Sequence, residues 1–450
     1  MATIAICVFP TPSVIMNAIA LAKRLRQRGH EVWIISTPDV EEMVRAEEVE
    51  FMPVLADLFR SGSFSAELRL LATLSWFAKF REVRRLNRVY RSILNPMLES
   101  RDNEIDRAFD RIDPDLVLVY SDVPTLVVIP LIALRRGLNC TYVTPLFHSF
   151  RGPASPPLPV GLVPRPSFWN RWAVRWAWTR YLLRRNTFRH IDIALGLDAD
   201  LPRLVRKLAP EKGEAGWPVR WDCFLAPKLS LPEFFLAPRE LEFDFEPRAG
   251  SHWLGWCFDE GRAEPTIMAE QIDPSRPLIY CAMGTLFHSF VPAPRRVAFF
   301  QAVLDALRAR PHLQLALATG NASEYETLEV NAPGALVRER FPQLQMLKRA
   351  RIMISHCGLH SLMECSSQGV PMIAFPLGFD QPGNAARVVY HGLGLRGDFR
   401  RATAESIGRL IDEALADEAM SRRCVAMAAR AGNRGAYESE MSALEALART

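Results

Sequence analysis

Short apolar runs alternate along the chain with segments of helical periodicity. Residues 4–8 form an apolar run that predicts a buried strand. Apolar residues then recur at helical spacing from Met16 to Leu25, and Gly29 follows the basic last turn as a stop signal. Residues 32–35 predict the next strand, so these elements together predict a βαβ unit.

The same alternation returns further along the chain. Strands are predicted at 115–120, 140–143, 278–281, 313–318, 352–355 and 372–375, with helices at 125–136 and 295–308. A long helical stretch, 67–98, interrupts this order and is expected outside the sheet. The pattern predicts an α/β fold in which two doubly wound, Rossmann-like domains face one another across an interdomain cleft.

The division between the domains is expected in a segment rich in proline and acidic residues, 227–247. Such a composition suits an interdomain connection, and its other interpretation is a surface loop within one domain. We expect an N-terminal domain over residues 1–240 and a C-terminal domain over residues 250–450. A helical region near 405–447 is expected to complete the second domain.

Composition narrows the class of protein. The chain has 450 residues, 49% of them hydrophobic, which is enough for a large core. A net charge of +5 is too small to favour nucleic acid as a partner. The eight cysteines show no metal-ligand spacing, and a reduced, cytoplasmic protein without a bound metal is the simplest expectation.

One segment carries most of the chemistry. A predicted buried strand delivers His356 to its carboxyl end, Gly358 permits a tight turn, and a helix is expected from about residues 359–361. The N-terminus of such a helix offers unpaired backbone N–H groups to an anion, and phosphate is the natural ligand. In the other interpretation, Ser361 and Glu364 form a capping box that serves the helix alone.

This segment resembles the donor-binding signature of glycosyltransferase family 1, the nucleotide-sugar-dependent enzymes of GT-B fold found in bacterial natural-product biosynthesis. The matching positions are His356, Gly358, Ser361, Glu364, Gly369-Val370-Pro371, Asp380, Gln381 and Asn384. The resemblance implies an inverting hexosyltransferase that takes its sugar from a nucleotide-diphosphate sugar, UDP- or dTDP-linked, as co-substrate, without a metal or other cofactor.

The resemblance also assigns roles to residues. His356 and Ser361, with the helix amides, would hold the diphosphate, and Glu364 would accept hydrogen bonds from ribose hydroxyls. Asp380 and Gln381 would bind hydroxyls of the sugar. His360 stands at the family's usual asparagine, where it either reaches the phosphates or points into solvent.

Weaker family features lie upstream. Thr285, in Met283-Gly284-Thr285, is placed to touch a phosphate oxygen, and Gln343 belongs to a run that holds the nucleobase. The tryptophan that stacks on the base in the family is replaced by Arg340, with Phe341 beside it. Either side chain can stack on a base, and the choice between uridine and thymidine stays open.

The N-terminal half resembles the family's acceptor domain, but Val14 occupies the position of the general-base histidine. Asp122, which matches the family's orienting aspartate, is expected to act as base, directly or with Ser13 as relay. Its other interpretation is an N-cap. His148 and His288 are further candidates, although each fits an ordinary loop histidine.

The missing histidine bears on the acceptor, a small lipophilic molecule in this family. A phenol or a carboxylic acid needs less help to lose its proton than an alkyl alcohol does, so we expect one of these groups. A rival hypothesis is a non-catalytic nucleotide-sugar-binding homologue or partner subunit that kept the donor site but lost the base.

Residues 168–189 combine arginine and tryptophan at helical spacing. Trp169, Trp172 and Trp176 fall on one side, with Arg171 and Arg175 adjacent. Three interpretations remain: tryptophans packed into the core under arginine stems, a wall of the acceptor pocket, or a helix at a membrane surface. The last would place the protein peripherally at the inner face of the membrane. The family resemblance further implies that the final helix crosses back to the first domain.

Overall fold

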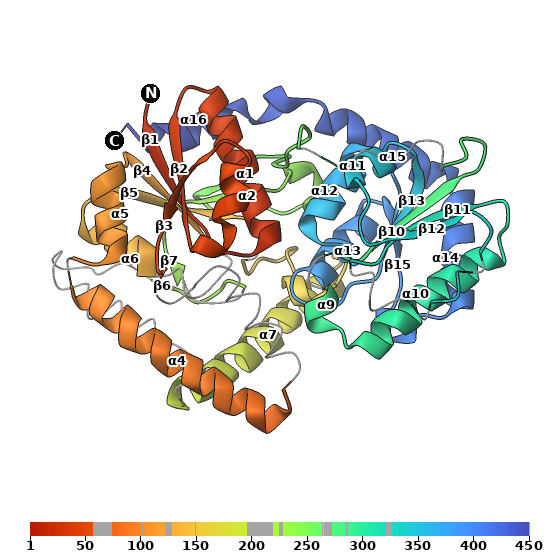
Figure 1. The fold of residues 1–450 in the computed structure, drawn as a ribbon, viewed down its shortest axis with the longest axis horizontal. Helices are drawn as coiled ribbons and strands as arrows, with labels where there is room; N and C mark the ends of the chain where they lie inside the picture. The colour runs from red at the N-terminus through yellow and green to blue at the C-terminus, as the bar shows by residue number, and fades with distance from the viewer. Residues whose placement is uncertain are drawn as a thin grey trace.

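The protein is described by a computed structural model over residues 1–56, 74–100, 102–121, 128–148, 150–195, 219–224, 228–262, 264, 272–284, 287–320, 326, 328–330 and 332–449. Two parallel sheets lie in separate halves of the molecule, with helices on their faces (Figure 1). The prediction of an α/β fold with two doubly wound domains is confirmed.

The first sheet has seven strands. In spatial order they are β3 (Glu50–Pro53), β2 (Glu31–Ser36), β1 (Thr3–Cys7), β4 (Leu116–Tyr120), β5 (Asn139–Thr144), β8 (Glu233–Phe235) and β9 (Ser251–Trp253). Its half of the chain also holds α1 (Pro12–Gln27), η1 (Pro38–Val40), α2 (Glu41–Arg45), α4 (Trp76–Glu99), α5 (Glu104–Ile112), α6 (Val128–Arg135), η3 (Leu158–Val160), α7 (Phe168–Ala194) and η5 (Arg239–Leu241). A small antiparallel pair, β6 (Val219–Arg220) and β7 (Lys228–Leu229), stands apart.

The second sheet has six strands. In spatial order they are β12 (Ala335–Arg338), β11 (Gln314–Ala318), β10 (Leu278–Ala282), β13 (Ala350–Ser355), β14 (Met372–Ala374) and β15 (Gly394–Arg396). Its helices are α9 (Phe287–Phe290), α10 (Ala293–Arg308), α11 (Gln343–Leu347), α12 (Leu359–Ser367), α13 (Gln381–Tyr390), η8 (Phe399–Arg401), α14 (Ala404–Ala416) and α15 (Glu418–Ala431), followed by η9 (Arg434–Tyr437) and α16 (Glu438–Ala446).

The apolar runs form strands because both faces of each sheet are covered. Along β4, Leu116, Leu118 and Tyr120 pack into the core on one face, and Val117 and Val119 pack into the core on the other. A strand buried on both faces needs apolar residues at every position, which explains the continuous runs in the sequence.

The segment 227–247 differs from its expected role as an interdomain connection. Residues 233–235 form β8, an inner strand of the first sheet, and Phe234 and Phe235 are fully buried. The paired phenylalanines supply enough apolar surface to outweigh the neighbouring prolines and acids. Since β9 also belongs to the first sheet, the chain changes sheets between Trp253 and Leu278, and the expected domain limits stay a prediction.

The last helix returns to the beginning of the chain. Helix α16 lies over the N-terminal half (Figure 1), where Met441 and Leu444 are fully buried in that half's core. Glu445 accepts a hydrogen bond from Arg28, at 3.1 Å from Nη2, and lies 3.1 Å from the His30 ring.

The tryptophans of helix α7 do not lie where one interpretation of the sequence placed them. Val174 and Trp178 face the core, but Trp169, Trp172 and Trp176 are 79%, 56% and 64% exposed. The interpretation that packs these three tryptophans into the core is therefore wrong. No helix in the described part of the chain is both long enough and apolar enough to span a bilayer.

Candidate active site

The two sheets have the same kind of strand order, and this order predicts where a ligand binds on each sheet. Each sheet begins with a strand at its centre, β1 or β10, and its chain then winds outward in both directions. Ligands of such sheets bind outside the carboxyl ends of the strands where the order reverses. In the second sheet this point lies between β10 and β13, and β13 leads directly into His356.

The His356 ring lies in a slot formed by two glycines. A Cβ atom on Gly358 would stand 2.6 Å from its Nε2, and a Cβ on Gly284, at the end of β10, would also stand 2.6 Å from Nε2. A Cβ atom at either position would therefore have to displace the ring. The Ser355 hydroxyl lies 3.3 Å from Nδ1, and burial lowers the pKa of His356 to about 4. The imidazole is therefore neutral at pH 7.

The turn after His356 presents the first amides of α12. Cys357 adopts a left-handed backbone, φ 65°, which is costly for a residue with a Cβ and is typical of functional turns. Gly358 is the N-cap and contributes no side chain, so no side-chain cap covers the amides that follow it. These amides lack partners within the helix and suit an anion.

The capping-box interpretation of Ser361 and Glu364 is wrong. Ser361 lies inside α12 rather than at its N-cap, and the Glu364 carboxylate turns toward other elements. Gln343, at the start of α11, donates a hydrogen bond to Glu364 at 2.7 Å and lies 3.5 Å from the Ser361 hydroxyl. The structure thus brings together three residues that the family resemblance assigns to the donor.

Arg262 completes this cluster and was missed from the sequence. Its guanidinium binds the buried Glu364 carboxylate and also Glu264, at 2.9 Å. Glu264 in turn accepts the backbone N–H of Leu344 at 3.1 Å, which fixes the start of α11. A ribose hydroxyl that reaches Glu364 must therefore share the carboxylate with Arg262 or displace it.

Asp380 and Asn384 connect α13 to the same turn. The Asn384 amide donates to Asp380 at 2.7 Å and to the carbonyl of Cys357 at 2.9 Å, so the residue joins the two donor-side segments. Burial raises the pKa of Asp380, and the Asn384 hydrogen bond opposes this shift. Gln381 uses its side-chain oxygen to accept the backbone N–H of Leu377 at 2.8 Å, which leaves its amide group for a ligand.

The two residues expected to stack on the nucleobase, Arg340 and Phe341, have different surroundings in the structure. Phe341 is buried and packs edge-on against Tyr280, with ring centroids 6.4 Å apart, so its face is not offered to a base. Arg340 is 83% exposed and remains the candidate. His360 is partly buried against the backbone of Cys257, and its Nε2 has no hydrogen-bond partner in the described structure.

Several candidates cannot be placed. Asp122 and Thr285 lie outside the described residues, and for Ser13 only the backbone is described, in the first turn of α1. Val14 is partly buried against the N-terminal core. Because β1 and β4 pair side by side, the segments that carry Ser13 and Asp122 both leave the sheet at its reversal point.

A buried polar network supports this edge of the first sheet. Ser121, which precedes Asp122, lies 2.6 Å from the Thr144 hydroxyl and 3.3 Å from the Glu233 carboxylate. Lys228 forms a buried ion pair with Glu233. These contacts tie the ends of β4, β5 and β8 together, one residue before Asp122 in the sequence.

His148 does not lie in an open site. Its ring is packed against Phe150 and Phe245, its Nδ1 is 3.5 Å from the Ser155 hydroxyl, and burial lowers its pKa strongly. A general base must reach the acceptor, so this aromatic cage does not favour His148 in that role. His288 is also engaged, with its Nε2 at 2.8 Å from the carbonyl of Thr319.

The two halves of the molecule meet next to His148. Glu242 accepts the backbone N–H of His148 at 2.6 Å and the Nε–H of Arg387, from α13, at 2.9 Å. Both charged side chains are completely buried, with the guanidinium between the rings of Phe147 and Phe243. Through these two contacts, Glu242 connects the helix that begins at Gln381 to the loop that follows β5.

Comparison with known proteins provides independent information. Residues 289–429 match the family model described as UDP-glucoronosyl and UDP-glucosyl transferase. The chain is 24% identical over 405 residues to zeaxanthin glucosyltransferase of Pantoea ananas, covering 86% of this chain and 83% of the relative. It is 28% identical over 227 residues to demethyllactenocin mycarosyltransferase of Streptomyces fradiae, covering 49% of this chain and 45% of the relative.

Solved structures show the same fold. The spinosyn forosaminyltransferase SpnP superposes with a TM-score of 0.66 at 16% identity, with all of both chains covered. The glycosyltransferase VinC, solved in complex with dTDP, superposes with a TM-score of 0.62 at 16% identity, covering 99% of each chain.

Proposed function

We propose that this chain acts as a family 1 glycosyltransferase of GT-B fold and transfers a sugar, with inversion, from a nucleoside-diphosphate sugar to a small lipophilic acceptor. The observation that carries the donor assignment is the uncapped start of α12 beside the neutral His356 ring. Zeaxanthin glucosyltransferase and demethyllactenocin mycarosyltransferase, by their names, act on lipophilic natural products, which supports the acceptor class.

We propose that the α12 amides and an N–H of His356 bind the diphosphate. These donors stabilise the negative charge that develops as the sugar–phosphate bond breaks, so the leaving group needs no metal ion. Ser361 adds a hydroxyl, and Glu364 binds the ribose with Gln343 positioned beside it. Asp380 and the free amide of Gln381 bind hydroxyls of the sugar.

The acceptor oxygen attacks the anomeric carbon from the face opposite the diphosphate. Its proton passes to Asp122, directly or through Ser13, while the nucleoside diphosphate leaves with the electron pair of the broken bond. An aspartate is a weak base, so the acceptor group is a phenol or a carboxylate rather than an alkyl alcohol. In a carboxylate the oxygen is already ionised at neutral pH, and no base is required.

A product assay tests this function. The protein is incubated with UDP- and dTDP-sugars and with phenolic or carboxylic acceptors, and the glycoside and its anomeric configuration are identified by NMR. We expect an inverted product and loss of transfer to a phenol in Asp122→Ala. Nucleotide-sugar binding without any glycoside would favour a non-catalytic binding protein, and full transfer to an alkyl alcohol by Asp122→Ala would refute the role of the aspartate.

A further inference from the structure

Helix α7 presents to solvent a surface that globular proteins normally cover. Trp169, Trp172, Trp176 and Leu183 recur at helical spacing and are each more than half exposed. Large apolar residues exposed in a row usually mark a contact surface, whereas single ones need no explanation. In Figure 1 the helix projects below the two sheets, away from the C-terminal helix α16.

The charge on this helix has one sign. Seven arginines and no acid lie between residues 165 and 190. Arg171 and Arg175 flank the tryptophan row on one side, and Arg180 and Arg184 follow on the other. Arg171, Arg175 and Arg180 are exposed, and none of them forms an ion pair with a residue that the structure describes. The charge of these three arginines is therefore not neutralised by an acidic side chain among the described residues.

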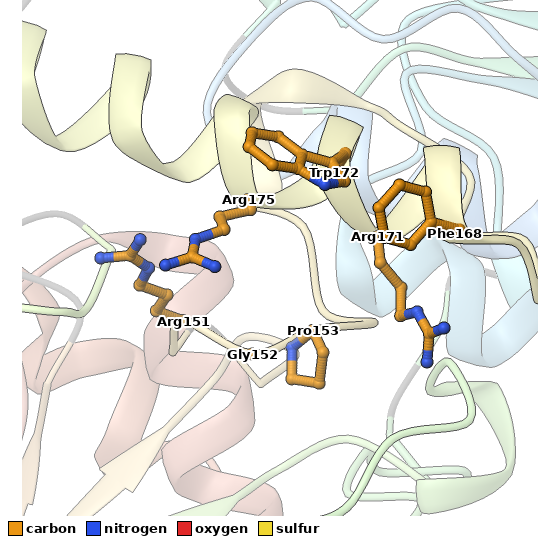
Figure 2. Close-up of a pocket in the computed structure, with 7 residues that line it drawn as sticks. All are labelled: Arg151, Gly152, Pro153, Phe168, Arg171, Trp172 and Arg175. Atoms are coloured by element: carbon orange, nitrogen blue, oxygen red, sulfur yellow. The ribbon is translucent and has the colours of Figure 1, made fainter.

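A pocket at the start of α7 gathers this charge. Its volume is about 620 Å³, and it is lined by Arg151, Gly152, Pro153, Phe168, Arg171, Trp172 and Arg175. Figure 2 shows the side chains of Arg151, on a loop, and Arg175, on α7, pointing toward one another, and the Trp172 ring also projects from α7. Positive side chains that line one pocket, with no acid among the lining residues, favour the binding of an anion there.

We propose that the exposed face of α7, with the Arg151–Arg175 pocket at its edge, docks the protein on an anionic lipid bilayer. Tryptophan rings settle at the headgroup level of a bilayer, and arginine stems reach from the same depth to lipid phosphates. A helix with aromatic residues on one side and unpaired arginines at its flanks lies in the plane of the interface. The guanidinium groups of Arg151 and Arg175, which line the pocket, bind a lipid phosphate.

Co-sedimentation with vesicles tests the proposal. The full chain is mixed with vesicles of phosphatidylcholine alone or enriched in phosphatidylglycerol, at low and at high salt. We expect binding to the anionic vesicles, weak binding to the neutral ones, and loss at high salt, because screening removes the attraction to the surface. Absence of binding to the anionic vesicles would overturn the proposal.

Two triple variants separate the contributions. In R171Q/R175Q/R180Q we expect the partition coefficient to fall about 100-fold, because each basic residue near an anionic surface contributes roughly a five-fold change. In W169A/W172A/W176A we expect a comparable loss that also affects the weak binding to neutral vesicles. All six side chains are exposed, so both variants should fold, and their circular dichroism and thermal unfolding are compared with the parent protein.

A matched control removes the same charge elsewhere. R400Q/R401Q/R409Q neutralises three exposed arginines of the C-terminal half, and it should retain binding to within about two-fold. Equal losses in R171Q/R175Q/R180Q and in this control would reduce the effect to net charge and overturn the assignment to α7.

Two further measurements address other occupants of the surface. If W169A/W172A/W176A converts a dimer into a monomer in sedimentation-velocity runs without lipid, the face is covered by a second copy and the proposal fails. If R171Q/R175Q/R180Q loses transfer to a water-soluble acceptor in lipid-free buffer, the pocket binds acceptor rather than lipid, and the proposal also fails.

Discussion

The buried ion pair between Glu242 and Arg387 gives a sharp quantitative prediction. Both side chains are fully buried, and they come from different halves of the molecule. Removing one member of such a pair leaves the other charge without compensation, at a cost of about 3–5 kcal/mol in the free energy of unfolding. We therefore expect Arg387→Met and Glu242→Met each to destabilise the protein within this range.

The structure indicates which single variant is worse. In Arg387→Met the Glu242 carboxylate keeps the backbone N–H of His148, 2.6 Å away, as a hydrogen-bond donor. In Glu242→Met the guanidinium keeps the faces of Phe147 and Phe243, but His148 loses its acceptor, at a further cost of about 1–3 kcal/mol. Glu242→Met is therefore expected at the upper end of the range.

The double variant tests the reasoning. Methionine at both positions fills the space without a charge, so only the lost acceptor of His148 remains as a penalty, and we expect the double variant to be less destabilised than either single variant. Urea unfolding followed by tryptophan fluorescence and circular dichroism measures all three. Additive effects of the single variants would refute the pair as a coupled unit. As a control, Glu418→Gln breaks an exposed ion pair with Arg422 and should change stability by less than about 0.5 kcal/mol.

Three further predictions concern the donor side. His356 has a pKa of about 4 in the folded protein, below its ordinary value of 6.5, so the free energy of unfolding should fall by about 3 kcal/mol as the pH drops from 6.5 to 4. His356→Asn should abolish this part of the pH dependence in urea titrations at several pH values. Gly284→Ala should displace the His356 ring and weaken nucleoside-diphosphate binding at least 10-fold by calorimetry, while unchanged affinity would contradict the glycine slot. Glu364→Gln should raise the donor KM about 10- to 100-fold through loss of a charge-assisted hydrogen bond. If the ribose displaces Arg262 from the carboxylate, Arg262→Gln should instead lower the donor KM. An equal rise of the donor KM in both variants would show that Arg262 supports binding.

The sequence predicts the local parts of the donor site well. The strand, turn and helix around His356 lie within about a dozen consecutive residues, so the apolar periodicity and Gly358 are enough to predict these elements. The carboxyl end of β13 and the start of α12 are where the pattern indicated. The choice between an anion site and a capping box needed the structure, because it depends on where the Glu364 side chain turns.

Contacts between distant segments were not predictable. Arg262 meets Glu364 across 102 positions of sequence, and neither residue belongs to a pattern that links them. The same is true of Glu242 and Arg387, which are 145 positions apart. The sequence did not reveal that Phe341 is unavailable for stacking, because Phe341 packs against Tyr280, a residue of strand β10 that is distant in sequence. Strand β8 was missed because its two phenylalanines stand among prolines and acids, which are typical of loops.

The return of α16 to the N-terminal half affects how the protein is made. Met441 and Leu444 are fully buried in the core that also contains β1, so this core cannot be completed until α16 has left the ribosome. While the second half is translated, the apolar surface that α16 covers in the N-terminal half stays exposed to solvent. An N-terminal fragment expressed alone would carry the same gap permanently and should aggregate unless a peptide spanning α16 is supplied.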